Sequence, residues 1–266
     1  MPYCNAVIRL DNRYGKPLLI VNLTIEVCAY SLADCLAAER AGAHRIELCA
    51  GRSEGGITPS IGLLWSVKKA VSVPVYVMIR PRGGDFVYAE TELRVMEADI
   101  LAAAQAGADG VVLGTLHPDG TIDVPTMRRL LDRAAPLPVT FHRAFDLTRD
   151  PHQALDTLID LGVQTVLTSG QRARAIDGID LLRALAGQAA GRIAIMAGSG
   201  VSAANARQLT GAGVSALHLS GSTRRDSPMQ FRRAGVPMAT AAMGDYERIE
   251  TSEAAVRAVV EQITTA

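Results

Sequence analysis

The sequence predicts a single-domain α/β protein with a (β/α)8 barrel, the TIM-barrel fold. Eight short β-type segments occur between residues 24 and 219, and a helical pattern follows nearly every one of them. Repeated β–α units require a parallel sheet, because their crossover connections are right-handed. Eight such units within about 200 residues favour a closed barrel.

The joints between helices and strands support the same fold. Residues 41–44 read Ala-Gly-Ala-His, residues 106–109 read Ala-Gly-Ala-Asp, and residues 211–214 are similar. Glycine adopts the left-handed conformation in which a helix ends before the chain turns back into a strand. The alternative, an open doubly wound sheet, predicts a Gly-x-Gly-x-x-Gly turn after the first strand. Residues 28–31 read Cys-Ala-Tyr-Ser instead, so we favour the barrel.

The elements are expected in a regular order along the chain. Strands are predicted near residues 24–28, 45–49, 74–80, 110–114, 138–143, 164–169, 192–197 and 214–219. Helices are predicted over residues 31–42, around 63–67, and over 90–106, 123–133, 150–161, 177–188, 202–211 and 252–264. Residues 1–22 show no clear period, so we assign them to an N-terminal extension, either a tail or a short extra strand, and residues 23–266 to the barrel.

Composition excludes several classes of partner. The formal net charge is zero, so no basic excess points to nucleic acid or to an acidic membrane surface. Aromatic residues make up only 4% of the chain, which leaves few platforms for base stacking. No apolar run approaches the roughly 20 residues of a membrane-spanning helix. The N-terminus lacks a signal-peptide pattern, so we expect a cytoplasmic protein.

The four cysteines all lie in the first fifth of the chain, at Cys4, Cys28, Cys35 and Cys49. In a reducing cytosol we expect free thiols. No Cys-x-x-Cys is present, which argues against a thioredoxin-type motif or a zinc ribbon.

A near-repeat contains two of these cysteines. Residues 25–29 read Ile-Glu-Val-Cys-Ala and residues 46–50 read Ile-Glu-Leu-Cys-Ala. Side chains two residues apart in a strand point to the same face, so each glutamate shares a face with the cysteine that follows it. If the two strands are neighbours, two carboxylates and two thiols converge.

Charged side chains interrupt the otherwise apolar strands at Glu26, Glu47, Arg80 and His142. Active sites of such barrels lie at the carboxyl ends of the strands, where these residues are expected. They could be structural, since Glu26, Glu47 and Arg80 could form a paired ionic layer in the core. Alternatively they are functional, as ligands of a metal ion or as part of a binding site for an anion.

Two metal sites are conceivable. Cys28 and Cys49 could offer two thiolates to Cu(I), which prefers sulfur, although free cysteines are also common as small buried apolar residues. Glu26, Glu47 and His142 could instead hold a harder divalent ion for acid–base chemistry on a sugar-like substrate.

An anion site is a further possibility. Gly198 and Gly200 follow the seventh strand, and Ser220 and Gly221 follow the eighth. Loops in these positions often bind phosphate through backbone N–H groups. Charge for this site could come from three arginines, Arg80, Arg82 and Arg143. The alternative is that Gly198 and Gly200 only make tight turns.

Several segments together resemble the copper homeostasis protein CutC family. They are Glu47-Leu-Cys-Ala, Glu54-Gly-Gly-Ile-Thr-Pro-Ser60, Val77-Met-Ile-Arg-Pro-Arg-Gly-Gly-Asp-Phe86, Gly107-Ala-Asp-Gly-Val-Val112, Thr140-Phe-His-Arg-Ala-Phe-Asp146 and Val166-Leu-Thr-Ser-Gly170. The resemblance covers residues 24–222. It implies a (β/α)8 barrel, a cytoplasmic homo-oligomer (a dimer or a tetramer) and a role in copper tolerance, with Cys28 and Cys49 as the copper ligands.

Two hypotheses about function therefore stand side by side. The first is a cytosolic copper homeostasis protein that binds Cu(I) through Cys28 and Cys49. The second is a barrel enzyme, an isomerase, lyase or hydrolase, that acts on a small hydroxylated or phosphorylated substrate. In the enzyme, Glu26, Glu47 and His142 would serve as acid–base groups or metal ligands, and Arg80 and Arg82 would bind the anion. The family pattern Gly-Gly-Gly after the seventh strand appears here as Gly-Ser-Gly, a departure within the possible anion site.

Overall fold

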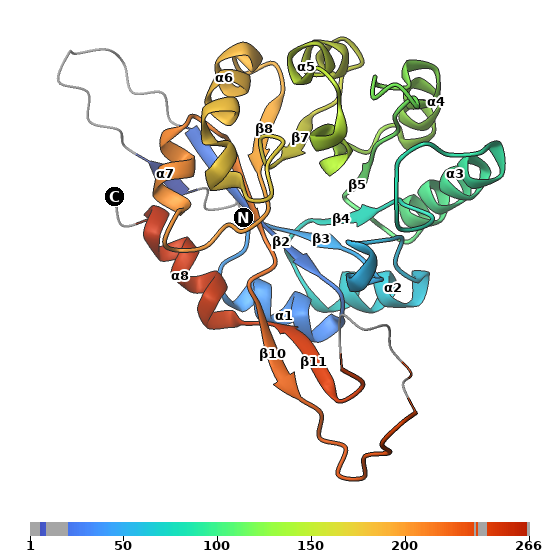
Figure 1. Ribbon diagram of the computed structural model, residues 1–266, viewed down its shortest axis with the longest axis vertical. Helices are drawn as coiled ribbons and strands as arrows, with labels where there is room; N and C mark the ends of the chain where they lie inside the picture. Colours follow the sequence, from blue (N-terminus) through green and yellow to red (C-terminus); the bar gives the residue numbers. More distant parts are fainter. Residues whose placement is uncertain (1–5, 9–20, 237, 239–243, 265–266) are drawn as a thin grey trace.

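A computed structural model describes residues 6–8, 21–236, 238 and 244–264. Eight parallel strands, β2 to β9, form a closed barrel in which β2 pairs with β9. The helices lie around the outside of this barrel (Figure 1). The predicted (β/α)8 barrel in a single domain is confirmed.

The barrel strands are short, as expected from the sequence. They are β2 (Val21–Ala29), β3 (Arg45–Leu48), β4 (Val75–Met78), β5 (Gly110–Leu113), β6 (Val139–Phe141), β7 (Thr165–Thr168), β8 (Ala194–Ala197) and β9 (Ala216–Leu219). The surrounding helices are α1 (Leu32–Arg40), α2 (Ile61–Ala70), α3 (Glu90–Gln105), α4 (Val124–Ala134), α5 (Pro151–Asp160), α6 (Ile179–Ala189), α7 (Ala206–Gly211) and α8 (Glu253–Thr264).

Local sequence explains where these helices begin and end. The Ser31 side chain accepts the N–H of Asp34 at the start of α1, and Asp123 accepts that of Thr126 at the start of α4. Gly42 (φ 92°) and Gly107 (φ 87°) take the left-handed conformation at the helix-to-strand joints.

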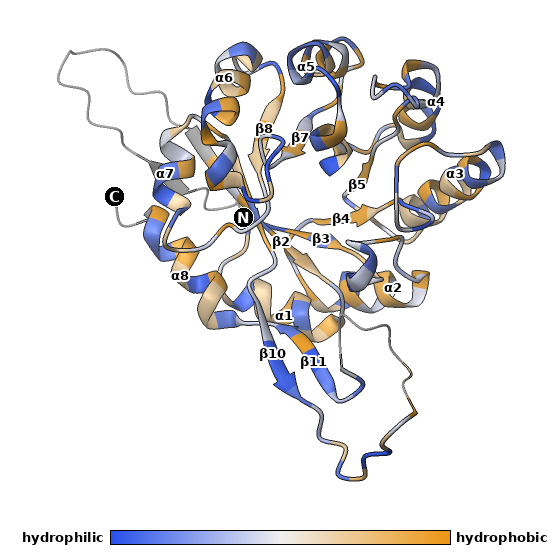
Figure 2. Ribbon diagram, in the orientation of Figure 1, coloured by the Kyte–Doolittle hydropathy of each residue, from blue (hydrophilic) through white to orange (hydrophobic). Residues whose placement is uncertain are grey.

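Three features differ from the sequence-based expectation. The segment near 177–188 begins as a 3₁₀ turn, Ala175–Gly178, before α6, and α7 starts four residues later than expected. Between β9 and α8 an unpredicted hairpin of β10 (Ser222–Asp226) and β11 (Glu247–Thr251) extends away from the barrel (Figure 1). The hairpin is mostly hydrophilic, unlike the barrel strands (Figure 2). Its sequence therefore lacks the alternation of apolar residues from which a strand is predicted.

Only part of the predicted N-terminal extension lies within the described residues. Residues 6–8 form β1 (Ala6–Ile8), which pairs antiparallel with residues 21–23 at the start of β2. Residues 1–5 and 9–20 lie outside the described residues. The division of the chain at residue 22 stays a prediction.

The barrel positions polar residues at one end. Its strands are buried runs, such as β5 and β7, in which every residue is buried. The carboxyl ends of all eight strands lie on one side, because the strands are parallel. A cavity of about 220 Å³ opens there, and it is the candidate functional site.

Candidate functional site at the barrel mouth

The register of three neighbouring strands places Glu26 between two basic side chains. Glu26 of β2 lies beside Arg45 of β3 and beside His218 of β9. Its Oε2 is 2.5 Å from Arg45 Nε, and its Oε1 is 2.7 Å from His218 Nδ1. Both carboxylate oxygens of the fully buried Glu26 are therefore paired with basic groups.

These pairings set the ionisation of Glu26. Burial raises the pKa of its carboxyl group, but Arg45 and His218 outweigh this effect and lower the pKa to about 2. Glu26 is consequently an anion that orients other groups, and each of its oxygens already accepts from a basic side chain.

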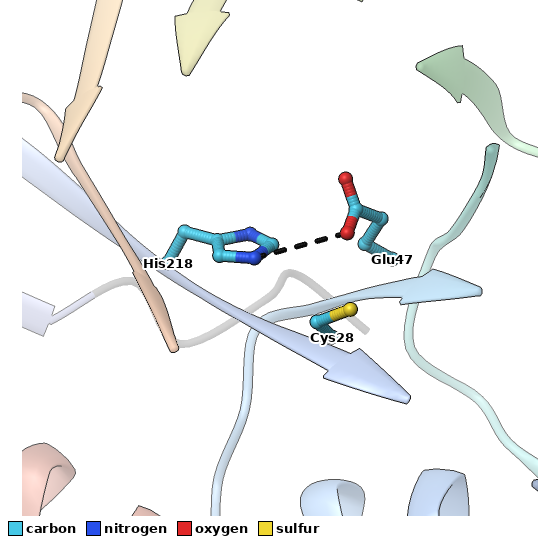
Figure 3. A group of neighbouring side chains, drawn as sticks. All are labelled: Cys28, Glu47 and His218. Atoms are coloured by element: carbon cyan, nitrogen blue, oxygen red, sulfur yellow. Dashed lines mark ion pairs between the residues drawn. The ribbon is translucent and has the colours of Figure 1, made fainter. Parts of the chain in front are cut away.

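His218 presents its other nitrogen to the cavity. Because Nδ1 is bonded to Glu26, Nε2 faces Glu47 of β3, with 3.7 Å between Nε2 and Oε2 (Figure 3). Burial lowers the pKa of His218, yet Glu47, Cys28 and Glu26 raise it well above the usual value. A carboxylate behind a histidine in this way fixes the ring orientation and increases the basicity of the exposed nitrogen.

The two cysteines of the near-repeat meet at the same place. The Cys28 and Cys49 sulfur atoms are 3.8 Å apart, and Cys49 Sγ is 3.5 Å from Glu47 Oε2. Cys28 lines the cavity, whereas Cys49 is completely buried. Hydrogen bonding from Cys49, together with His218, lowers the pKa of Cys28 well below that of an ordinary thiol. Burial and the neighbouring Cys28 raise the pKa of Cys49.

Three of these residues could hold a metal ion together. One donor atom each of Cys28, Glu47 and His218 lies within 4.8 Å of the others (Figure 3). Met78 lines the cavity as well and packs in one cluster with Cys28 and Cys49. The convergent group supplies a thiol, a carboxylate and an imidazole, and the adjacent Cys49 thiol and Met78 thioether make its surroundings rich in sulfur, which a soft ion such as Cu(I) prefers.

Three residues that line the cavity each have a buried polar atom without a protein partner. It is lined by Cys28, Tyr30, Glu47, Gly55, Met78, Arg80, Phe86, His142, Arg143, Leu167, Ser199, Gly200, His218, Leu219 and Ser220. Glu47 Oε1, Arg80 Nε and His142 Nε2 are buried and make no hydrogen bond. Burial and the charge of Cys28 raise the pKa of Glu47 well above its usual value.

His142 lies in the cavity wall, apart from the convergent donor group of Cys28, Glu47 and His218. Its Nδ1 accepts the N–H of Ala144, and its ring packs on Phe86 with 4.7 Å between centroids. Burial and the nearby Arg80 lower the pKa of His142 to about 3, so the ring is neutral. The histidine that the structure brings to Glu26 and Glu47 is His218.

The two arginines of the predicted anion clamp have separate roles. Arg80 donates from Nη1 and Nη2 to the carbonyl oxygens of Glu54, Gly56 and Gly84, and so it holds two loops at the mouth, while its Nε makes no hydrogen bond. Arg82 does not line the cavity, and it pairs with Glu92 and Asp85 at the surface. Arg82 therefore lies outside the cavity that Arg80 lines.

The loops after β8 and β9 contribute unequally to the cavity. Gly200 and Ser220 line it, but Gly198 and Gly221 do not. A Cβ at Gly198 would lie 2.5 Å from Leu167, and one at Gly221 would lie 2.6 Å from Val256. These two glycines are required by close packing.

Sequence reasoning assigned no role in the site to Arg45 or His218. His218 is recognisable as a polar residue near the end of the last strand, but its partner Glu26 lies 192 residues earlier. Only the closure of the barrel, which pairs β9 with β2, brings them together. The signal that could have found them is the expected register of neighbouring strands in a closed barrel.

Comparison with known proteins identifies the family of this chain. The CutC family model matches residues 23–223. The chain belongs to the CutC family. The copper homeostasis protein cutC homolog of Homo sapiens is 49% identical over 225 residues, covering 84% of this chain and 82% of the human protein. A family protein CutC from Klebsiella pneumoniae (strain 342) is 51% identical over 215 residues, covering 80% and 86% of the two chains.

Solved structures place the CutC family among the barrels. The crystal structure of a CutC protein from Streptococcus agalactiae superposes with a TM-score of 0.72 and 37% identity, covering 74% of this chain and 98% of that one. Phosphoribosylanthranilate isomerase from Thermotoga maritima has a TM-score of 0.56 at 12% identity, covering 92% of this chain and all (100%) of that one, and shares the fold alone. Within the described ranges, no helix has the length and hydropathy to span a bilayer.

Proposed function

We propose that this CutC family chain handles copper by binding Cu(I) at the barrel mouth through the thiolates of Cys28 and Cys49. The observation that carries the proposal is the 3.8 Å separation of the two sulfur atoms beside a cavity. Two thiolates bound to one metal ion at roughly 2.3 Å each need such proximity. The names of the relatives, copper homeostasis proteins, support the same ligand.

His218 completes the proposed site. Its Nε2 lies within 4.8 Å of Cys28 Sγ, and Glu26 orients the ring from behind. This arrangement gives Cu(I) a third, nitrogen ligand after a small adjustment of side chains. Glu26 and Glu47 are not needed as ligands, which fits the weak affinity of Cu(I) for oxygen.

Competition for Cu(I) against a chromogenic chelator tests the proposal. The variant that combines Cys28→Ser with Cys49→Ser should bind Cu(I) at least about 100-fold more weakly than the wild type. Cys35→Ser is the matched control, because Cys35 is a buried free cysteine on α1 whose pKa is raised to about 12. Unchanged affinity in the double variant would refute copper binding at this site.

The barrel-enzyme alternative is supported by one arrangement, the histidine held between two carboxylates. His218 contacts Glu26 through Nδ1 and faces Glu47 through Nε2, as an acid–base group with an orienting partner does. In that role His218 takes the place expected for His142. The cytoplasmic location, the homo-oligomeric state and the absence of nucleic-acid and membrane partners stay predictions.

A further inference from the structure

The cavity has a second set of binding groups, opposite in character to the sulfur donors. It consists of backbone N–H groups and arginine, from the loops after β6, β8 and β9. Ser199, Gly200, Ser220 and Arg143 line the cavity. None of these residues is needed for the copper site proposed above.

The loop after β8 is held in an unusual conformation. Ser199 has φ 79° and Gly200 has φ 69°, so two successive residues are left-handed. For Ser199 this conformation is strained, and such strain persists only where the surroundings enforce it. The Ser199 side chain donates to the carbonyl of Ala173 at 2.7 Å, and its own carbonyl accepts the N–H of Ala175 at 2.9 Å. The turn is therefore fixed before any ligand arrives.

This turn leaves its donors unused. Within the part of the chain that the structure describes, the N–H groups of Ser199, Gly200 and Ser220 have no hydrogen-bond acceptor. Successive free N–H groups in a turn form a concave anion-binding feature. Arg143 adds charge, since Nε pairs with Asp146 and Nη2 with Ser169 while Nη1 has no acceptor among the described residues.

A second, independent observation indicates a ligand larger than a simple anion. Glu47 Oε1, Arg80 Nε and His142 Nε2 are unpartnered, belong to side chains at least nine-tenths buried, and line the same cavity. Because His142 Nδ1 accepts a backbone N–H, its Nε2 carries the proton and is a donor. Two donors and a carboxyl group match the hydroxyl groups of a ligand.

We infer that the cavity binds a small hydroxylated phosphate monoester, with its phosphate at the N–H groups of Ser199, Gly200 and Ser220 and at Arg143. Its hydroxyl groups reach Glu47, Arg80 and His142. The cavity of about 220 Å³ limits the ligand to a few carbon atoms, since pockets for drug-sized ligands span roughly 300–1,000 Å³. The inference names a ligand class for the barrel-enzyme alternative and is independent of copper binding.

Amide-resolved nuclear magnetic resonance of the ¹⁵N-labelled, copper-free protein tests this inference. Glycerol 3-phosphate should shift the amide signals of Ser199, Gly200 and Ser220 in a saturable way. Inorganic phosphate should shift the same signals with weaker affinity, and glycerol at equal concentration should leave them unmoved. Absence of saturable shifts at these three amides overturns the inference, and so does a response to glycerol that equals the response to glycerol 3-phosphate.

Two variants sharpen the test. Arg143→Gln should weaken glycerol 3-phosphate binding about tenfold or more, since a charged hydrogen-bond donor is lost. Arg183→Gln is the matched control, because Arg183 also pairs at 2.8 Å with an aspartate three residues away, Asp180, but lies outside the cavity. Equal affinities of Arg143→Gln and the wild type overturn the inference. The variant that combines Cys28→Ser with Cys49→Ser should keep its phosphate response even though it loses copper, which separates the two proposals.

Discussion

The near-repeat Ile-Glu-x-Cys-Ala occurs within β2 and again from β3 into the residues that follow it, and yet the pKa values of its two glutamates are shifted in opposite directions. Glu26 of β2 makes short contacts with Arg45 and His218, and its pKa is lowered to about 2. Glu47 of β3 has an oxygen without a partner, and burial raises its pKa. The two glutamates therefore differ in pKa although the residues around them in the sequence are nearly the same, because the neighbouring strands supply different partners.

The cysteines differ in the same way. Cys28 of β2 lines the cavity and has a lowered pKa, whereas Cys49, which directly follows β3, is fully buried and has a raised pKa. In the parallel register, Cys28 lies beside Glu47, and Glu26 lies beside Arg45. Because of this register, the carboxylate of Glu26 lies below the cavity and is paired with basic side chains. The carboxylate of Glu47 lies at the cavity and has one oxygen without a hydrogen-bond partner.

The largest expected effect contrasts the two glutamates in stability. Glu26→Gln leaves the mostly buried Arg45 without its counter-charge, which should cost about 3–5 kcal/mol of unfolding free energy. Glu47→Gln replaces a carboxyl group that has an unpartnered oxygen, so it should change the unfolding free energy by at most about 1 kcal/mol. Urea unfolding of both variants measures the difference. Equal losses of unfolding free energy in the two variants would contradict the different roles assigned to Glu26 and Glu47.

Acid should weaken the protein through Glu26 in particular. Its pKa of about 2 lies below the usual value of 4.5, so its contribution is fully present above pH 4.5 and is lost as the pH falls toward 2. The loss amounts to roughly 3 kcal/mol for this shift. The contribution of Glu47 to stability changes with pH in the opposite direction, because its raised pKa favours the folded state at low pH.

Unfolding free energies of the wild type and Glu26→Gln between about pH 5 and pH 2 give this measurement. The difference in unfolding free energy between the two proteins should shrink on acidification. The wild type loses the stabilisation from the ionised Glu26 as this group is protonated, and the variant lacks that stabilisation at every pH. A difference that stays constant over this range would contradict the low pKa of Glu26.

The sequence allowed the barrel to be predicted because its signals are local. Glycine joints such as those at Gly42 and Gly107, and apolar strands, identify β–α units without reference to distant residues. Alternation within a strand likewise placed Glu26 with Cys28 and Glu47 with Cys49 on common faces. Both cysteines do meet at the mouth, with their sulfur atoms 3.8 Å apart.

What could not be predicted depends on contacts between distant strands. The partner of Glu26 on β9, His218, is fixed only by barrel closure, so His142 was the expected histidine. Arg80 was expected to bind an anion, but its burial requires that most of its donors bind loop carbonyls. The hairpin of β10 and β11 is hydrophilic, and nearly all of it lies beyond the family match, which ends at residue 223.

The X-ray absorption spectrum of the Cu(I)-loaded protein at the copper edge tests the central claim most directly. The account predicts two sulfur scatterers, from Cys28 and Cys49, and one imidazole nitrogen from His218. In His218→Ala the nitrogen contribution should disappear while both sulfur scatterers remain. A copper shell of oxygen and nitrogen atoms without sulfur would contradict the proposed site.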